Sequence, residues 1–187
     1  MSIRIIDNFL DEKYFYKIQS HIEKNHFPWF YRDNITNGEE NSSSTGIGKY
    51  GFNHVLIDGK PTYNIDILNG LIYEMIKATG SNDIFRCRLD MTVNSGESIV
   101  LDPHVDFFFP HISSILYINN SDGNTIIYNQ KYNDHDKYDQ KLIVKEEIEP
   151  VANRLLIFDG LFIHTGCTPS KNNRRILINS NFRYREL

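Results

Sequence analysis

Apolar residues recur at helical spacing in two early stretches of the chain and at strand spacing in most of the rest. Within residues 11–24, three apolar residues fall at i, i+3 and i+7, which predicts an amphipathic helix with Asp11 as its N-cap. A second apolar stripe predicts a helix over residues 64–79, and Gly80 is suited to end it. Residues 3–6, ahead of the first helix, have the character of a short strand.

Beyond residue 80 the pattern is that of short strands separated by turn residues. Residues 86–94 alternate between an apolar and a polar face, as a strand with one buried side does. The polar face carries Arg86, Arg88, Asp90, Thr92 and Asn94. Further strands are expected at 98–105, 113–119, 124–129, 140–148, 154–158, 161–165 and 175–183. Two helices followed by about eight strands predict a mainly β (α+β) fold with N-terminal helices, most simply a jelly roll with the helices on one outer face.

Two polar segments interrupt these elements. Residues 32–51 are rich in Gly, Ser and Asn, which predicts a mobile loop, and its length makes it a candidate lid. Residues 131–141 are expected to form a solvated hairpin loop.

The composition and charge of the chain limit the classes of protein to which it can belong. The chain has 187 residues, 40% of them hydrophobic, which suits one domain over residues 1–187. The net charge of −4 argues against nucleic acid as a partner, although residues 171–187 are locally basic. No stretch has the length of a membrane span or the form of a signal peptide, so no membrane partner is expected. Cys87 and Cys167 form no disulfide framework, which indicates reduced thiols and a cytoplasmic location.

His104 and Asp106 are separated by one residue in a stretch with strand character. On a strand, residues i and i+2 point to the same face, so an imidazole and a carboxylate can reach one cation. His21 and Glu23 have the same spacing in the predicted first helix, where the side chains diverge by about 200° around the axis and cannot share a metal. Alone, the pair of His104 and Asp106 is a weak signal, because this spacing arises readily by chance.

His164 and Arg175 give this pair a chemical context. His164 ends an apolar strand, and Arg175 follows eleven residues later in the last predicted strand. Two histidines and one carboxylate can occupy one face of Fe(II) and leave three positions open. A keto acid such as 2-oxoglutarate can fill two of these positions and dioxygen the third. A dicarboxylic cosubstrate then needs a fixed cation for its far carboxylate, which a guanidinium supplies.

Several short motifs occur in order between residues 86 and 184. They are Pro103-His104-Val105-Asp106, Ile115–Asn119, Asp122-Gly123-Asn124-Thr125, Glu149-Pro150, Asn153–Asp159, His164-Thr165-Gly166 and Arg174–Asn179. The ordered set resembles the Fe(II)/2-oxoglutarate-dependent dioxygenases, and within them the prolyl 4-hydroxylase-like branch. The resemblance implies a double-stranded β-helix (jelly roll, cupin-like) as the catalytic barrel over residues 86–184. Residues 1–85 are then expected to supply supporting helices and the mobile loop.

Carried over by position, the resemblance implies that His104, Asp106 and His164 hold Fe(II). Arg175 is expected to pair with the distal carboxylate of 2-oxoglutarate, with Arg174 as the rival. The resemblance favours Arg175, because eleven residues from the second histidine is a familiar spacing in the family and Phe182 then falls where the family's last strand has its aromatic. Strand alternation then places Arg175, Leu177, Asn179 and Asn181 inward and leaves Arg174 outside.

Further cosubstrate contacts are implied less directly. Tyr117 matches a position where related enzymes place a hydroxyl on the same carboxylate, and its alternative role is that of a barrel aromatic. Asn94 stands where several relatives have a cosubstrate-binding Tyr, and its amide can donate a hydrogen bond in that place. Asp122 replaces the first Gly of the family's turn.

The polar face of the strand at 86–94 is the expected substrate wall. If it faces the barrel mouth, Arg88, Asp90 and Thr92 lie near the substrate, which would then be polar. The alternative is an edge strand with this face in solvent.

The predicted activity is hydroxylation of an unactivated C–H bond, with Fe(II) and 2-oxoglutarate consumed to give succinate and CO2, and with ascorbate as an auxiliary reductant. Prolyl, peptidyl or amino-acid substrates are the first expectation, and nucleobases or small metabolites are the alternative. A non-catalytic jelly-roll binding domain is the competing hypothesis from another class. A cupin isomerase ranks last, because the chain has no His-X-His motif. The oligomeric state is not predicted.

Overall fold

The computed structural model describes residues 2–35, 49–62, 66–133 and 141–185. Its helices are α1 (Glu12–Ile22), the short 3-10 helix η1 (Asp66–Leu68) and α2 (Asn69–Thr79). Its strands are β1 (Arg4–Ile6), β2 (Phe30–Arg32), β3 (Gly51–Asp58), β4 (Lys60–Pro61), β5 (Ile84–Val93), β6 (Ile112–Tyr117), β7 (Thr125–Lys131), β8 (Val144–Ile148), β9 (Leu155–Asp159), β10 (Phe162–Gly166) and β11 (Arg174–Phe182). The described chain is therefore mainly β with two α-helices in its N-terminal part, as the sequence predicts.

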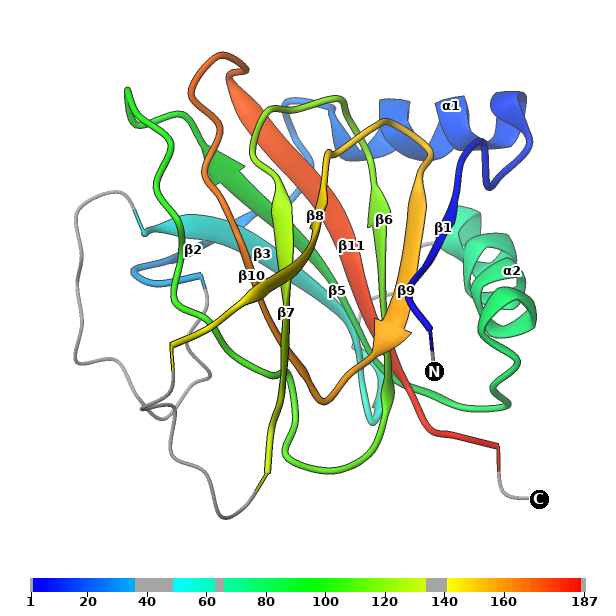
Figure 1. The fold of residues 1–187 in the computed structure, drawn as a ribbon. Coiled ribbons are helices and arrows are strands. Elements are labelled where there is room, and N and C mark those ends of the chain that lie inside the picture. Colours follow the sequence, from blue (N-terminus) through cyan, green and yellow to red (C-terminus); the bar gives the residue numbers. More distant parts are fainter. Residues whose placement is uncertain (1, 36–48, 63–65, 134–140, 186–187) are drawn as a thin grey trace.

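The strands form two sheets that face each other (Figure 1). The large sheet has the order β1-β9-β6-β11-β5-β3-β2, with β4 paired to β3, and all of its pairings are antiparallel. The small sheet has the order β10-β7-β8. Side chains from both sheets, including Tyr117, Ile127 and Phe158, form a buried cluster between them.

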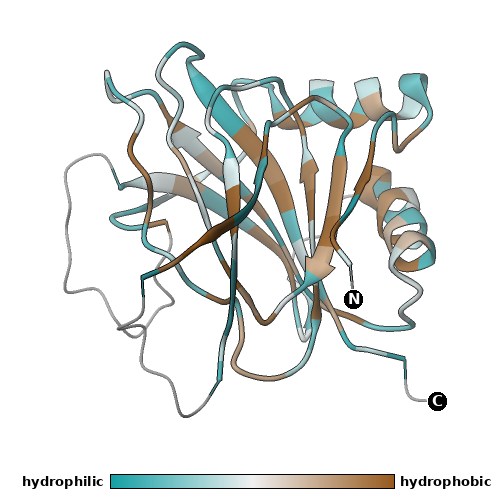
Figure 2. Ribbon diagram, viewed as in Figure 1, coloured by the Kyte–Doolittle hydropathy of each residue, from teal (hydrophilic) through white to brown (hydrophobic). Residues whose placement is uncertain are grey.

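The two α-helices cover the outer face of the large sheet (Figure 1). Phe15, Ile18 and Ile22 of α1 and Leu71 and Met75 of α2 are buried in the largest apolar cluster, which includes residues of β5, β6 and β11. Figure 2 shows hydrophobic positions along the central strands of the large sheet and in both α-helices. The outer face of this sheet is thus covered by the helices, so a site has to lie on the inner face, toward the small sheet.

The predicted N-cap of the first helix and the predicted C-cap of the second are confirmed, whereas α1 ends at Ile22 rather than at residue 24 and α2 begins at Asn69 rather than at residue 64. The Asp11 side chain accepts hydrogen bonds from the backbone N–H groups of Lys13 and Tyr14, as an N-cap does. Gly80 ends α2 in the left-handed conformation with φ of 72°, which favours glycine because it has no Cβ.

Two features of the fold differ from the sequence prediction. The strand expected at 98–105 is present only as two isolated bridges, Val100 with Cys167 and His104 with His164. Three strands, β2 to β4, were not expected in residues 1–85, where a short strand at 3–6, two helices and a loop were predicted. Both faces of β3 are largely buried, so its sequence shows no alternation of polar and apolar residues.

Parts of both predicted loops, residues 36–48 and 134–140, lie outside the described residues. No helix in the described ranges has the length and apolar character needed to cross a membrane.

Candidate metal and cosubstrate site

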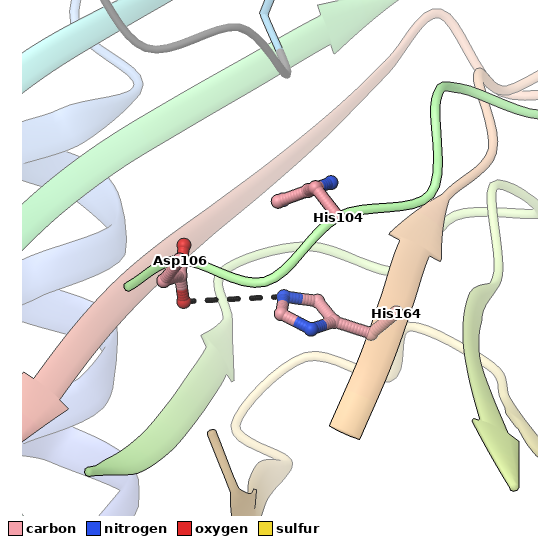
Figure 3. A group of neighbouring side chains, drawn as sticks. All are labelled: His104, Asp106 and His164. Atoms are coloured by element: carbon pink, nitrogen blue, oxygen red, sulfur yellow. Dashed lines mark ion pairs between the residues drawn. The ribbon is translucent and has the colours of Figure 1, made fainter. Parts of the chain in front are cut away.

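His104, Asp106 and His164 come together at the inner side of the small sheet (Figure 3). Their ligand atoms all lie within 4.8 Å of one another, and no other such group of His, Cys, Asp or Glu occurs among the described residues. His104 and His164 are paired across a β-bridge by two backbone hydrogen bonds of 2.9 Å. The backbone therefore fixes the separation of the two imidazoles.

Both imidazoles are also oriented by the backbone. The Nδ1 atom of His104 lies 2.9 Å from the carbonyl of Asp102, and that of His164 lies 3.0 Å from the carbonyl of Phe162. An Nδ1–H that donates to a carbonyl leaves the Nε2 lone pair available to a metal. The Nε2 atom of His164 lies 3.9 Å from Oδ2 of Asp106 (Figure 3).

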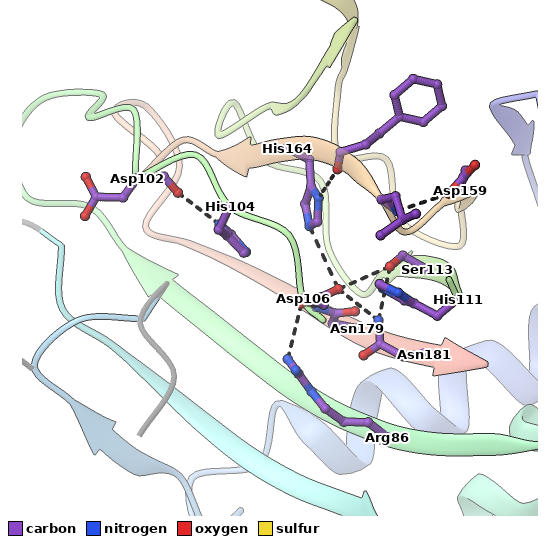
Figure 4. A network of polar contacts seen from close by, with 12 residues as sticks. Arg86, Asp102, His104, Asp106, His111, Ser113, Asp159, His164, Asn179 and Asn181 are labelled. Atoms are coloured by element: carbon purple, nitrogen blue, oxygen red, sulfur yellow. Dashed lines mark hydrogen bonds and ion pairs between the residues drawn. The ribbon is translucent and has the colours of Figure 1, made fainter. Parts of the chain in front are cut away.

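The Asp106 carboxylate is held by four side chains of the large sheet (Figure 4). Oδ1 accepts hydrogen bonds from Arg86 Nη2 at 3.3 Å and Asn179 Nδ2 at 3.2 Å. Oδ2 accepts from Ser113 Oγ at 3.2 Å and Asn181 Nδ2 at 2.9 Å. These contacts fix the orientation of the third candidate ligand.

The protonation states also suit metal binding. Burial lowers the pKa of His164 to about 4, so its imidazole is neutral near pH 7. Burial alone would raise the pKa of Asp106, but the charge of Arg86 and the neighbouring histidines keep it well below its usual range. A neutral imidazole and an ionised carboxylate are the forms that bind metals.

Arg175 lies in the same cavity as the two histidines and is only 6% exposed. Its Nη2 donates a hydrogen bond of 2.7 Å to Thr125 Oγ1, and its Nε has no partner in the structure. A Cβ on Gly166 would lie 3.1 Å from Arg175 Nη1, so the glycine leaves room for the guanidinium. No described carboxylate forms an ion pair with Arg175. Burial lowers the pKa of this guanidinium, which an anionic ligand would offset.

Arg174 has the opposite placement. It points away from the cavity and pairs with Glu23 at 3.1 Å on the helix side of the sheet. Of the two rival arginines, the structure therefore places Arg175 in the cavity.

The cavity lies between the two sheets and is open to solvent at its mouth. It is lined by Ile35, Arg88, Asp90, Thr92, Leu101, His104, Ile115, Thr125, His164, Thr165, Gly166, Arg175, Leu177 and Asn179.

The polar stripe of β5 forms one wall of this cavity. Arg88 Nε and Asp90 Oδ1 form an ion pair at 2.7 Å, and Thr92 Oγ1 is buried without a partner. Strand β5 lies inside the large sheet between β11 and β3, so the alternative of an edge strand facing solvent is wrong.

Two of the expected cosubstrate contacts do not line the cavity. Asn94 donates through Nδ2 to the carbonyls of Ser170 at 2.8 Å and Asn172 at 3.3 Å, so its amide holds a loop instead. Tyr117 is fully buried behind Thr125, to whose Oγ1 its hydroxyl donates at 2.7 Å. Tyr117 thus reaches the cavity only indirectly, through Thr125 and through Arg175, whose Cζ lies 5.8 Å from the centroid of the Tyr117 ring.

Asp122 also holds the loop that Asn94 contacts. Its carboxylate accepts from the Ser170 hydroxyl at 2.7 Å and from the backbone N–H groups of Ser170, Lys171 and Asn172. This loop leads directly into β11 and Arg175.

Sequence reasoning gave no role to Arg86, Ser113 and Thr125, and gave Asn179 and Asn181 only an inward direction. The alternation of β11 was the available signal for both asparagines. Arg86 stood on the polar face of its strand and Thr125 ended the Asp122–Thr125 motif, whereas nothing in the local pattern marks Ser113.

The sequence matches no family model and no curated protein. The structure is similar to solved structures over nearly its whole length. For a prolyl-4-hydroxylase of Pseudomonas putida the TM-score is 0.58 at 14% identity, covering 98% of this chain and 93% of that one. For a prolyl hydroxylase of Trichoplax adhaerens, in complex with a hypoxia inducible factor peptide fragment, the TM-score is 0.63 at 16% identity, covering 96% of this chain and 83% of that one.

A third neighbour is SnoN, a non-heme α-ketoglutarate-dependent epimerase from nogalamycin biosynthesis, with a TM-score of 0.67 at 11% identity, covering 97% of this chain and 81% of that one. The neighbours also include a member of the 2OG-Fe(II) oxygenase family from Burkholderia pseudomallei. At these identities the likeness establishes the fold. The chain therefore has the fold of the 2-oxoglutarate/Fe(II) oxygenases, which the prolyl-4-hydroxylases share.

Proposed function

We propose that the protein is an Fe(II)- and 2-oxoglutarate-dependent oxygenase that hydroxylates an unactivated C–H bond, acting as one domain over residues 1–187 with a double-stranded β-helix core. One observation carries this proposal. Arg175, a buried arginine without an anionic partner, lines the same cavity as His104 and His164. Asp106, the carboxylate of the group, adjoins that cavity. A binding domain without chemistry gives no reason to bury this combination of charges.

The donor set fits Fe(II). His104, Asp106 and His164 would hold the ion through two imidazole nitrogens and one carboxylate oxygen, which leaves positions free for other ligands. Bound iron supplies the activation of dioxygen, coupled to the conversion of 2-oxoglutarate to succinate and CO2. Ascorbate, as a reductant that keeps iron ferrous, belongs to the same proposal.

Buried donors without partners support the cosubstrate assignment. Arg175 and Thr92 are directly opposite in the pairing of β11 with β5, and Arg175 Nε and Thr92 Oγ1 both lack a hydrogen-bond partner. Thr125 Oγ1 accepts from both Tyr117 and Arg175, so its own hydrogen is available to the cavity. Together these groups can bind one carboxylate, such as the far end of 2-oxoglutarate. In this proposal Thr92 serves the cosubstrate, and Asn94 does not.

The protein's own residues orient and isolate the reacting groups. The imidazoles are fixed through their carbonyl contacts, and Asp106 is fixed by its four donors. Leu101, Ile115 and Leu177 supply apolar walls that exclude water around the polar ligands. We infer a prolyl, peptidyl or amino-acid substrate in the cytoplasm, with a small metabolite or nucleobase as the alternative.

Anaerobic addition of Fe(II) and 2-oxoglutarate tests this proposal. We expect a visible charge-transfer band in the wild-type protein and its loss in His104→Ala. Arg175→Gln should weaken 2-oxoglutarate binding at least tenfold, because a charged hydrogen-bonded pair is lost, whereas Arg174→Gln should bind as the wild type does. A wild-type protein that shows no band and forms no succinate would exclude this function.

A further inference from the structure

The charged wall formed by β5 indicates the chemical class of the substrate. We propose that Arg88 binds a free carboxylate of the substrate, so that the substrate is a small carboxylic acid such as a free α-amino acid rather than an internal residue of a peptide. This inference rests on the proposed function and narrows it.

Arg88 has donors to offer to a ligand. Its side chain lines the cavity and is 18% exposed. Only its Nε is engaged, in the ion pair with Asp90, and within the described ranges its terminal nitrogens donate no hydrogen bond. A guanidinium presents these nitrogens as a planar fork that matches a carboxylate.

The position of Arg88 separates it from the cosubstrate anchor. Arg88 pairs with Asn179 in the register of β5 with β11, and Asn179 Nδ2 lies 3.2 Å from Oδ1 of Asp106. Arg175 pairs with Thr92, four residues further along both strands. One arginine is therefore close to the metal ligands and the other is at the far end of the cavity, so they suit two different anions.

A count of formal charges supports a carboxylate group on the substrate. Around the cavity and the Asp106 carboxylate, the described residues include Arg86, Arg88 and Arg175 against Asp90 and Asp106. Divalent iron and the dianion of 2-oxoglutarate would cancel each other, which leaves one net positive charge. A buried charge without a partner is costly, and a carboxylate placed against it offsets that cost locally, even in an α-amino acid, whose ammonium group makes the molecule neutral overall. The backbone of an internal peptide residue has no carboxylate to place there.

Binding measurements with matched pairs of ligands test the inference without turnover. The common L-amino acids and their carboxamides are titrated calorimetrically, under nitrogen, into the protein with Fe(II) and 2-oxoglutarate. We expect at least one free acid to bind, and its carboxamide to bind at least tenfold more weakly. Arg88→Gln should weaken binding of that acid at least tenfold, whereas Arg174→Gln serves as the control with wild-type affinity.

A second variant controls for misfolding caused by the loss of the Arg88 charge. Arg88→Gln leaves Asp90 without its partner, so the double variant Arg88→Gln/Asp90→Asn, which removes both charges, should show the same loss. Equal affinity for acid and amide would overturn the inference, as would undiminished acid binding in both variants.

Failure of this inference can be told apart from failure of the proposed function. If the charge-transfer band forms but no free acid binds, the carboxylate assignment is wrong and the oxygenase assignment stands. If the band is absent but acid binding depends on Arg88, the oxygenase assignment is wrong and the carboxylate assignment stands. Loss of the band in Arg88→Gln but not in Arg175→Gln would make Arg88 the cosubstrate anchor and overturn the inference.

Discussion

At the scale of single residues, the site depends on side chains that hold other side chains. Asp106 has four donors, and only Arg86 among them carries a charge. The Arg86 guanidinium also lies over the Phe107 ring, with Cζ 5.0 Å from its centroid. Arg86 therefore has two opposed effects on a bound metal: it orients the carboxylate, and it adds a like charge nearby.

Replacement of Arg86 by Gln should strengthen metal binding roughly tenfold. Three neutral donors would still orient Asp106. The relief of the repulsion between a cation and a divalent metal is offset in part by the loss of a charged donor to the carboxylate, which leaves a net gain on the order of 1 kcal/mol. Competition between the protein and a chelator for Co(II) measures this affinity, with Arg183→Gln as a surface control. Weaker binding would mean that orientation by Arg86 outweighs its charge.

At the scale of elements, the role of a side chain could be predicted from the sequence only where the residues that it contacts lie nearby in the chain. The alternation within residues 86–94 placed Arg88, Asp90 and Thr92 on one face, because strand geometry alone decides this. The roles of Asn94 and Asp122 could not be predicted, because both side chains hold the loop at 170–172. Their contact residue Ser170 is 76 residues from Asn94 and 48 residues from Asp122 in the chain. Strand β3 was missed since burial on both sides removed its periodicity.

Replacement of Asp122 by Asn should destabilise the protein near pH 7 by on the order of 1 kcal/mol, since a solvent-screened carboxylate with several donors is lost. Despite some desolvation, hydrogen bonds from Ser170, Asn172 and Lys171 hold the pKa of Asp122 well below its ordinary value. A depressed folded-state pKa contributes stability above the unfolded value near 4, and this is lost as the pH falls below it.

Chemical denaturation at several pH values checks this prediction. The difference between wild type and Asp122→Asn should shrink as the pH falls from 5 toward 2. A difference that is independent of pH would show that the Asp122 charge is not what stabilises the loop.

At the scale of the whole molecule, the buried site links stability to pH. Burial lowers the pKa of His164 to about 4 from an ordinary value near 6.5, so the unfolded chain binds more protons between these values. The metal-free protein should therefore lose stability as the pH falls from about 6.5 to about 4, by up to about 3 kcal/mol from this group.

Urea denaturation of the metal-free protein across this range measures the effect. In His164→Gln, which cannot be protonated, the dependence on pH should be shallower. An unchanged slope in this variant would assign the acid sensitivity to other groups.

The two sheets contribute different parts of the metal site. His164 belongs to β10 of the small sheet and is paired with His104 by a bridge, whereas the donors that hold Asp106 belong to β5, β6 and β11 of the large sheet. An ion bound to all three ligands would thus act as a cross-link between the layers. Loss of iron would loosen β7, β8 and β10 from the large sheet, so that resistance to proteolysis would report iron content independently of turnover.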